Sequence, residues 1–114
     1  MSFGTNYILN ERDEPVICPL LIVWALWMAA NRLGARRVAR WVANDVEVST
    51  VFLGIDHNFG DGPAILWETM VFKDGESVDQ RRCSGSREQA LAMHEEMVEA
   101  VKALDRIQKR GWLP

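Results

Sequence analysis

The chain has 114 residues and a formal net charge of −3, with 48% hydrophobic and 25% charged residues. Such a length fits a single domain with its own core, and such a composition lies far from that of disordered chains. Binding nucleic acid through bulk charge requires clustered Lys and Arg, so the mild acidity argues against direct nucleic-acid binding. We therefore expect one domain over residues 1–114.

The first third of the chain predicts a short strand and then an unusually apolar helix. Residues 6–10 are typical of a strand, and residues 1–10 lack the basic start and apolar run of a targeting segment, so we expect none. Pro19 suits the first turn of a helix from Leu20 to Leu33, and Gly34 suits its end. The apolar stretch at 17–30 has about two thirds of the ~20 residues needed to span a bilayer, so we expect no membrane span.

The helix Leu20 to Leu33 carries apolar residues on all of its faces, including LLIVWALWMAA. Such a helix must be covered on more than one side. It could lie between the sheet and a second helix, or one of its faces could form a subunit interface. A chain this short has little else to cover it, so we favour a homo-oligomer formed through this helix.

Four consecutive strands are predicted in the middle of the chain, because β-branched residues alternate there between turn signals. Two-residue hairpin turns are expected at Asn44–Asp45 and Asp74–Gly75. A longer loop, DHNFGDGP, joins the second and third of these strands at residues 56–63. The predicted strands cover residues 36–43, 46–55, 64–73 and 78–83.

A second helix is predicted after the last strand. Ser86 and Gln89 have the capping-box spacing, and the apolar stripe that follows reaches about Gln108, before a stop at Gly111. The predicted order is β-α-β-β-β-β-α. This order indicates an α+β fold, an antiparallel four- to five-stranded meander with two helices packed on one face.

The hairpin turns also predict which polar side chains meet across the sheet. They place Thr50 opposite Ala39 and Glu68 opposite Arg81, and a symmetric loop would place Thr50 across from Glu68. The result would be a row of Thr50, Glu68 and Arg81. A simple Glu–Arg pair on a sheet face, worth roughly 0.2–1 kcal/mol, is the commoner arrangement and the one we favour.

The loop contains the only other grouping of polar residues that could carry chemistry. His57 could act as a general base oriented by Asp56, and both could bind a metal with Asp61 and the remote Glu68. Adjacent strand residues point to opposite faces, however, and Asp and Asn often cap loops through backbone N–H groups. We therefore favour structural capping, and we predict no catalytic residue, metal or cofactor.

The remaining chemically notable residues are assigned to packing. Cys18 and Cys83 lack zinc-site or redox spacing, so we expect free thiols. The pKa of Cys83, close to a helix N-terminus, could be lowered, although an inert thiol is favoured. His94 is expected on the surface. Five tryptophans could stack on a ligand but are expected mainly in the core or an interface: Trp24, Trp27, Trp41, Trp67 and Trp112.

The block VSTVFLGIDHNFGDGPAILWETMVF at 48–72 follows an RRVARW strand and precedes a Ser-capped helix that contains a His. This arrangement resembles a family of small proteins of tailed bacteriophages and prophages, across most of the chain. The sequence departs from the family in its first helix, which is more polar in the relatives. The resemblance implies an accessory protein in the host bacterial cytoplasm, in a class that often inhibits CRISPR and other defence systems.

Three functions follow from these observations. The favoured one is a non-enzymatic phage protein that binds and modulates a host protein through a surface that includes the loop. A second is a nucleotide or small-molecule binder with a pocket made of the loop, Trp67 and Arg81. A third is a metal-dependent hydrolase using Asp56, His57 and Glu68. The predicted binding residues are Asp56, His57, Asn58, Phe59, Asp61, Trp67, Glu68 and Arg81.

Overall fold

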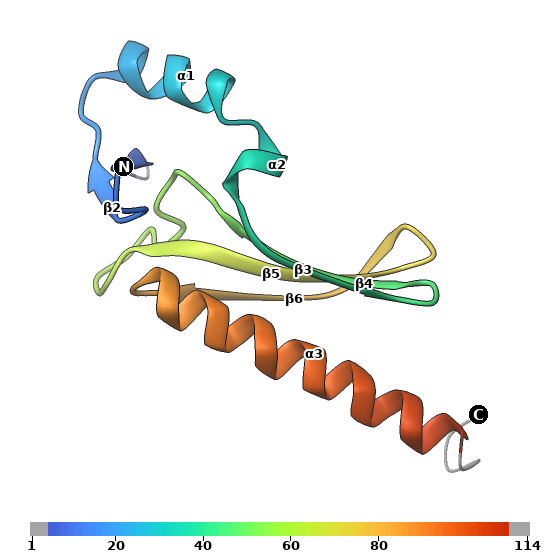
Figure 1. Cartoon of the computed structure of the whole chain (residues 1–114). Helices are drawn as coiled ribbons and strands as arrows, with labels where there is room; N and C mark the ends of the chain where they lie inside the picture. The colour runs from blue at the N-terminus through green and yellow to red at the C-terminus, as the bar shows by residue number, and fades with distance from the viewer. Residues whose placement is uncertain (1–4, 110–114) are drawn as a thin grey trace.

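A computed structural model describes residues 5–109 of the protein, which is built on a four-stranded antiparallel sheet. The strands lie side by side in chain order, as a meander (Figure 1). They are β3 (Arg37–Ala43), β4 (Val46–Phe52), β5 (Ile65–Lys73) and β6 (Glu76–Ser84). Both predicted two-residue turns are present, and Asn44 and Asp74 have positive φ values of 55° and 53° in them. The predicted α+β meander is confirmed.

A separate two-stranded sheet precedes the meander. β1 (Tyr7–Leu9) matches the predicted first strand, and it pairs antiparallel with β2 (Pro15–Ile17). β2 is not among the predicted strands, and it begins at a proline. A proline can occupy the first position of a short edge strand, where it interrupts no ladder hydrogen bond. The turn between β1 and β2 is closed by Asn10, whose Oδ1 accepts hydrogen bonds from the backbone N–H groups of Arg12 and Glu14.

The first predicted helix is divided into α1 (Leu21–Ala30) and α2 (Leu33–Arg36). The division occurs at Asn31, whose backbone N–H and side-chain Nδ2 both donate to the carbonyl of Trp27, at 2.8 and 2.9 Å. These bonds satisfy one of the last carbonyl groups of α1 and close its end. The prediction that Gly34 stops the helix is wrong, because Gly34 lies inside α2.

α3 (Arg87–Lys109) lies along one face of the meander (Figure 1). Its predicted capping box is confirmed: Gln89 N–H donates to Ser86 Oγ, and Ser86 N–H donates to Gln89 Oε1, both at 3.3 Å. The predicted stop at Gly111 lies outside the described residues. The buried core forms between this helix and the sheet. Its residues are Val48, Phe52, Leu66, Trp67, Val71, Ala90, Met93, Met97 and Val98.

α1 lies on the other side of the sheet from α3, at the end where β1, β2 and the loop between β4 and β5 gather (Figure 1). Trp24 Nε1 donates to the carbonyl of Gly54 at 2.9 Å, and the rings of Trp27 and Phe52 meet edge to face at 6.0 Å. Of the two predicted helices, only α3 lies along a face of the four-stranded sheet. α1 meets the sheet at its end, on the other side (Figure 1).

Among the described residues, no helix is both long and apolar enough to cross a membrane.

Candidate functional site

The predicted row of Thr50, Glu68 and Arg81 does not form. Thr50 does lie opposite Ala39, as predicted, but its partner on β5 is Thr69. Across the next pair of strands, Glu68 is opposite Arg82 and not Arg81. A shift of one residue moves a side chain to the other face of a sheet, so Thr50 and Glu68 point in opposite directions.

A β-bulge accounts for the shift between β5 and β6. The register changes between Val71, which pairs with Asp79, and Phe72, which pairs with Ser77. Val78 is therefore the extra residue of β6, and the pairings from Val71 to Trp67 are moved by one, until a second shift between Trp67 and Ile65 restores the count. A count from the Asp74–Gly75 turn therefore gives the wrong partner for the strand pairs between these two shifts, including that of Glu68.

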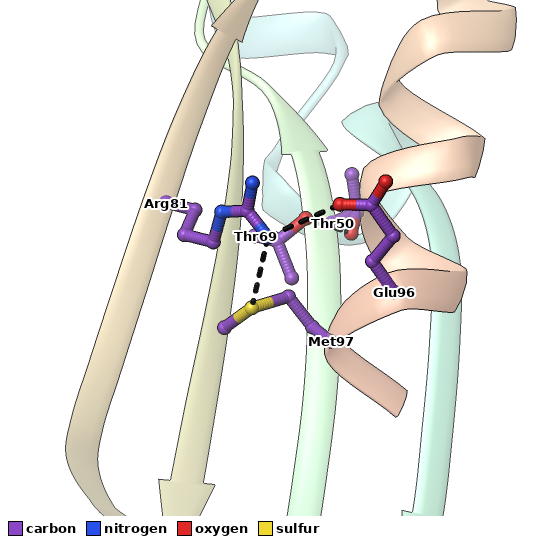
Figure 2. A network of polar contacts seen from close by, with 5 residues as sticks. All are labelled: Thr50, Thr69, Arg81, Glu96 and Met97. Atoms are coloured by element: carbon purple, nitrogen blue, oxygen red, sulfur yellow. Dashed lines mark hydrogen bonds and ion pairs between the residues drawn. The ribbon is translucent and has the colours of Figure 1, made fainter. Parts of the chain in front are cut away.

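The two arginines that follow one another on β6 consequently form different ion pairs on different faces. Arg82 Nε lies 2.6 Å from Glu68 Oε2, on the sheet face away from α3, and Glu68 is buried. Arg81 Nη1 lies 3.2 Å from Glu96 Oε2 of α3, and both of these side chains are more than half exposed. Figure 2 shows Arg81 reaching towards α3, where it also approaches the Met97 sulfur at 4.0 Å.

The loop at 56–63 is held by its own side chains. Asp56 Oδ1 accepts hydrogen bonds from the backbone N–H groups of Asn58 at 2.7 Å and Ile65 at 2.9 Å. The Asn58 amide donates to the carbonyls of Asp61 and Pro63 and accepts from Gly60 N–H. Both side chains therefore make the predicted capping hydrogen bonds.

The other loop residues that were predicted to bind a partner remain at the surface. His57 Nδ1 bonds to the carbonyl of Ile55 at 2.8 Å, and its ring lies 6.2 Å from that of Phe59. Phe59 is 63% exposed, and Asp61 is also exposed. Within residues 5–109, no three His, Cys, Asp or Glu side chains are grouped in a way that could hold a metal ion. The loop therefore presents an apolar tip at the surface.

Trp67 is a core residue. Its side chain is completely buried against Phe52, with ring centroids 5.1 Å apart, and its Nε1 donates to the carbonyl of Gly85 at 2.8 Å. No face of the ring is open to a ligand. Since Arg81 is paired with α3, the pocket of loop, Trp67 and Arg81 that a nucleotide binder would need is not assembled.

A buried polar network under α3 was not predicted. His94, expected on the surface, is 3% exposed, and its Nδ1 lies 2.9 Å from Thr50 Oγ1. Thr50 Oγ1 in turn lies 2.5 Å from Thr69 Oγ1; Figure 2 shows the two threonines side by side under the helix. Burial lowers the pKa of His94, and this effect outweighs the opposite influence of the nearby Glu95. The surface prediction for His94 is wrong because its helical position shares the face of Met97 and Ala90.

The cysteines behave as structural residues. Both Cys18 and Cys83 are free thiols, as predicted, and Cys18 is buried. Burial raises the pKa of the Cys83 thiol, and this effect outweighs the opposite influence of Arg81. The alternative that the pKa of the Cys83 thiol is lowered is therefore wrong. Cys83 is poorly suited to act as a nucleophile.

The outer surface of α1 is apolar, and the rest of the chain that the structure describes leaves it exposed. Trp24, Trp27 and Met28 turn inward at helical spacing, but no residue of α1 is buried. We call the exposed apolar side chains of residues 16–26 the apolar helix surface. Its members, 37–67% exposed, are Val16, Ile17, Leu20, Leu21, Ile22, Val23 and Leu26.

The chain matches no protein-family model, and searches of curated proteins and of solved structures find no match.

Proposed function

We propose that the protein is a non-enzymatic binding protein that modulates a host protein, and that the apolar helix surface is its main contact. The observation that carries this proposal is the exposure of α1. Leu21, Ile22 and Leu26 are each about two thirds exposed. The residues next to them in α1 are apolar as well. A contiguous apolar surface of this kind is typical of a protein-interaction site.

The chemistry of α1 favours a protein over a lipid surface as the partner. Helices that lie in a membrane interface combine an apolar face with a face rich in Lys and Arg. α1 (LIVWALWMAA) has no charged residue, and the chain as a whole is acidic. An uncharged apolar helix fits a partner with an apolar groove, in the manner of helix-in-groove recognition.

The attachment of α1 also suits a binding role. Trp24 and Trp27 fix the helix to the body of the protein through the Gly54 carbonyl and the Phe52 ring. The outward side chains are therefore presented by a helix that is already formed and placed. Such preorganisation reduces the entropy lost on binding.

The loop at 56–63 is a second part of the proposed contact. The hydrogen bonds of Asp56 and Asn58 hold its backbone, and Phe59 stands exposed at its tip. Exposed aromatic side chains on rigid loops are frequent anchors in protein interfaces. The hydrolase alternative receives no such support, because the described residues contain no metal-binding group of three acidic, His or Cys side chains.

The resemblance to phage and prophage proteins supports a partner in the host bacterial cytoplasm. Small proteins of that class often bind and inhibit host machinery, including CRISPR and other defence systems. Inhibition of such a system requires binding but no catalysis. The proposal therefore extends to an anti-defence role for this chain.

The test is affinity capture from host lysate with the wild-type protein and with an Ile22→Gln, Leu26→Gln double variant. We expect the recovered partner to be lost with the double variant. A matched control is Val42→Gln, since Val42 is 50% exposed on β3, away from α1. Its capture should equal that of the wild type.

Light scattering on the same three proteins separates the partner from a second copy of the chain. We expect a monomer at the concentrations used for capture. The proposal is contradicted if the double variant still captures the partner, or if the wild type is a dimer that the double variant converts to a monomer. In the latter case α1 is a subunit interface, as the sequence favoured.

A further inference from the structure

A wedge-shaped cavity of about 300 Å³ lies between the C-terminal half of α3 and the sheet. Figure 1 shows α3 diverging from the sheet towards its C-terminal end, near the turn that joins β3 and β4. The cavity is far from the apolar helix surface, which is at the opposite end of the sheet. Its size is at the lower end of the ~300–1,000 Å³ range of small-molecule sites.

The walls of this cavity are apolar. Trp41, Val46 and Val71 line it from the sheet, and Val101 and Leu104 line it from α3. The core continues into this region, because Trp41, Val46 and Val101 pack against the buried Val48, Val71, Met97 and Val98. Leu104 nevertheless remains 46% exposed. The wedge is thus an apolar extension of the core that the described residues leave open at one end.

The rim of the cavity is mainly cationic. Among the residues whose side chains the structure describes, Lys73, Lys102 and Arg106 line it together with one carboxylate, that of Asp45. The Lys102 ammonium lies 5.9 Å from the centre of the Trp41 ring, and 3.4 Å from Glu99 Oε1. The protein as a whole is acidic, but three cations lie at the rim of this apolar cavity. The cavity therefore favours a ligand that carries negative charge.

From this juxtaposition we infer that the wedge binds a small amphipathic organic anion, with its apolar body against Trp41 and Leu104 and its anionic head beside Lys73 and Arg106. The walls supply burial of apolar area, and the rim supplies charge complementarity. A neutral molecule of the same shape would gain only the first. This site is separate from the proposed protein contact, so either proposal can fail without the other.

Octanoate is a suitable probe, and 1-octanol is its neutral control. A titration followed by backbone amide NMR should shift residues 41–46 and 101–106 with octanoate. Octanol should bind at the same place several-fold more weakly, because it lacks the charge that the rim attracts. Raising the salt concentration should weaken octanoate binding more than octanol binding.

Two variants test the walls and the rim separately. Leu104→Gln removes an exposed wall residue, and Arg106→Glu reverses one rim charge; each should weaken octanoate binding about fivefold, as expected for a partly exposed contact. Leu26→Gln on α1 and Arg12→Glu in the β1–β2 turn are matched controls and should leave binding unchanged. Shifts confined to α1, equal binding of octanol, or no shift at all would overturn the inference.

Discussion

His94 Nδ1 lies 2.9 Å from Thr50 Oγ1, so a histidine of α3 is hydrogen-bonded to the centre of the sheet. Because Thr50 also contacts Thr69, the bond connects the helix with two central strands inside the core. Buried polar bonds are directional, whereas apolar contacts are not. The network therefore fixes the position of α3 along the sheet, which the apolar side chains alone would leave less well defined.

The first prediction concerns the dependence of stability on pH. Burial lowers the pKa of His94 below its ordinary 6.5, so the unfolded chain takes up a proton more readily than the folded one. The free energy of unfolding should be greatest above pH 6.5, and it should decrease as the pH falls through 6.5 until the folded protein is protonated too. Urea unfolding between pH 7.5 and 5.5 measures this.

The control for the pH prediction is His94→Gln, which keeps a hydrogen-bonding side chain at the position but cannot titrate. Its free energy of unfolding should vary less over the same pH range. If the wild type and the variant lose stability in parallel between pH 7.5 and 5.5, then His94 is not the source of the pH dependence.

The second prediction tests the Thr50 hydroxyl. Thr50→Val keeps the shape of the side chain but leaves His94 and Thr69 without their shared buried partner. The loss of a buried hydrogen-bond partner costs about 1–3 kcal/mol, so we expect a decrease of this size in the free energy of unfolding. Thr5→Val, at an exposed position, should change it by less than about 0.5 kcal/mol. Equal effects of the two variants would contradict the network's role.

The third prediction uses the two adjacent arginines of β6. Arg82→Ala leaves the buried Glu68 carboxylate without its ion-pair partner, and should destabilise the protein by about 1–2 kcal/mol. Arg81→Ala removes an exposed pair with Glu96 and should cost at most about 0.5 kcal/mol. Chemical denaturation of both variants gives the comparison. The reverse order would mean that the register across β5 and β6 follows the uninterrupted count from the turn.

The fourth prediction concerns the attachment of α1. Gly54 has a φ of 79°, and a Cβ added there would lie 2.8 Å from the Met28 sulfur. Gly54→Ala should therefore lower the free energy of unfolding by about 1–2 kcal/mol, through backbone strain and displacement of Met28. Gly34→Ala in α2 meets no neighbouring atom and should be neutral or slightly stabilising. Thermal unfolding distinguishes them, and equal melting temperatures would contradict the prediction.

The elements that short-range chemistry specifies could be predicted from the sequence. Asn44–Asp45 and Asp74–Gly75 combine residue types that accept positive φ, and both form the expected hairpin turns. Ser86 and Gln89 cap α3 as their spacing predicts. The capping role of Asp56 and Asn58 could also be predicted from the sequence. Each side chain bonds to backbone groups within the loop or at its ends.

The candidate sites could be predicted less well, because they depend on which strand faces which. Alternation in β6 looks the same with or without the extra residue Val78, yet that residue decides whether Glu68 meets Arg81 or Arg82. The sequence marked Trp67 as a possible ligand contact, and packing against Phe52 made it core. His94 carried no local signal of burial beyond its helical spacing from Met97.

The sequence by itself determined the α+β meander, its two tight turns, the cap of α3 and the apolar character of the first helix, since these depend on residues close together in the chain. Only the tertiary structure decided that the outer face of α1 stays exposed, that His94 joins Thr50, and that α3 diverges to leave an open cavity. The physical reason is that burial is a property of a residue's spatial neighbours. Those neighbours come from strands and helices that the chain brings together over long distances.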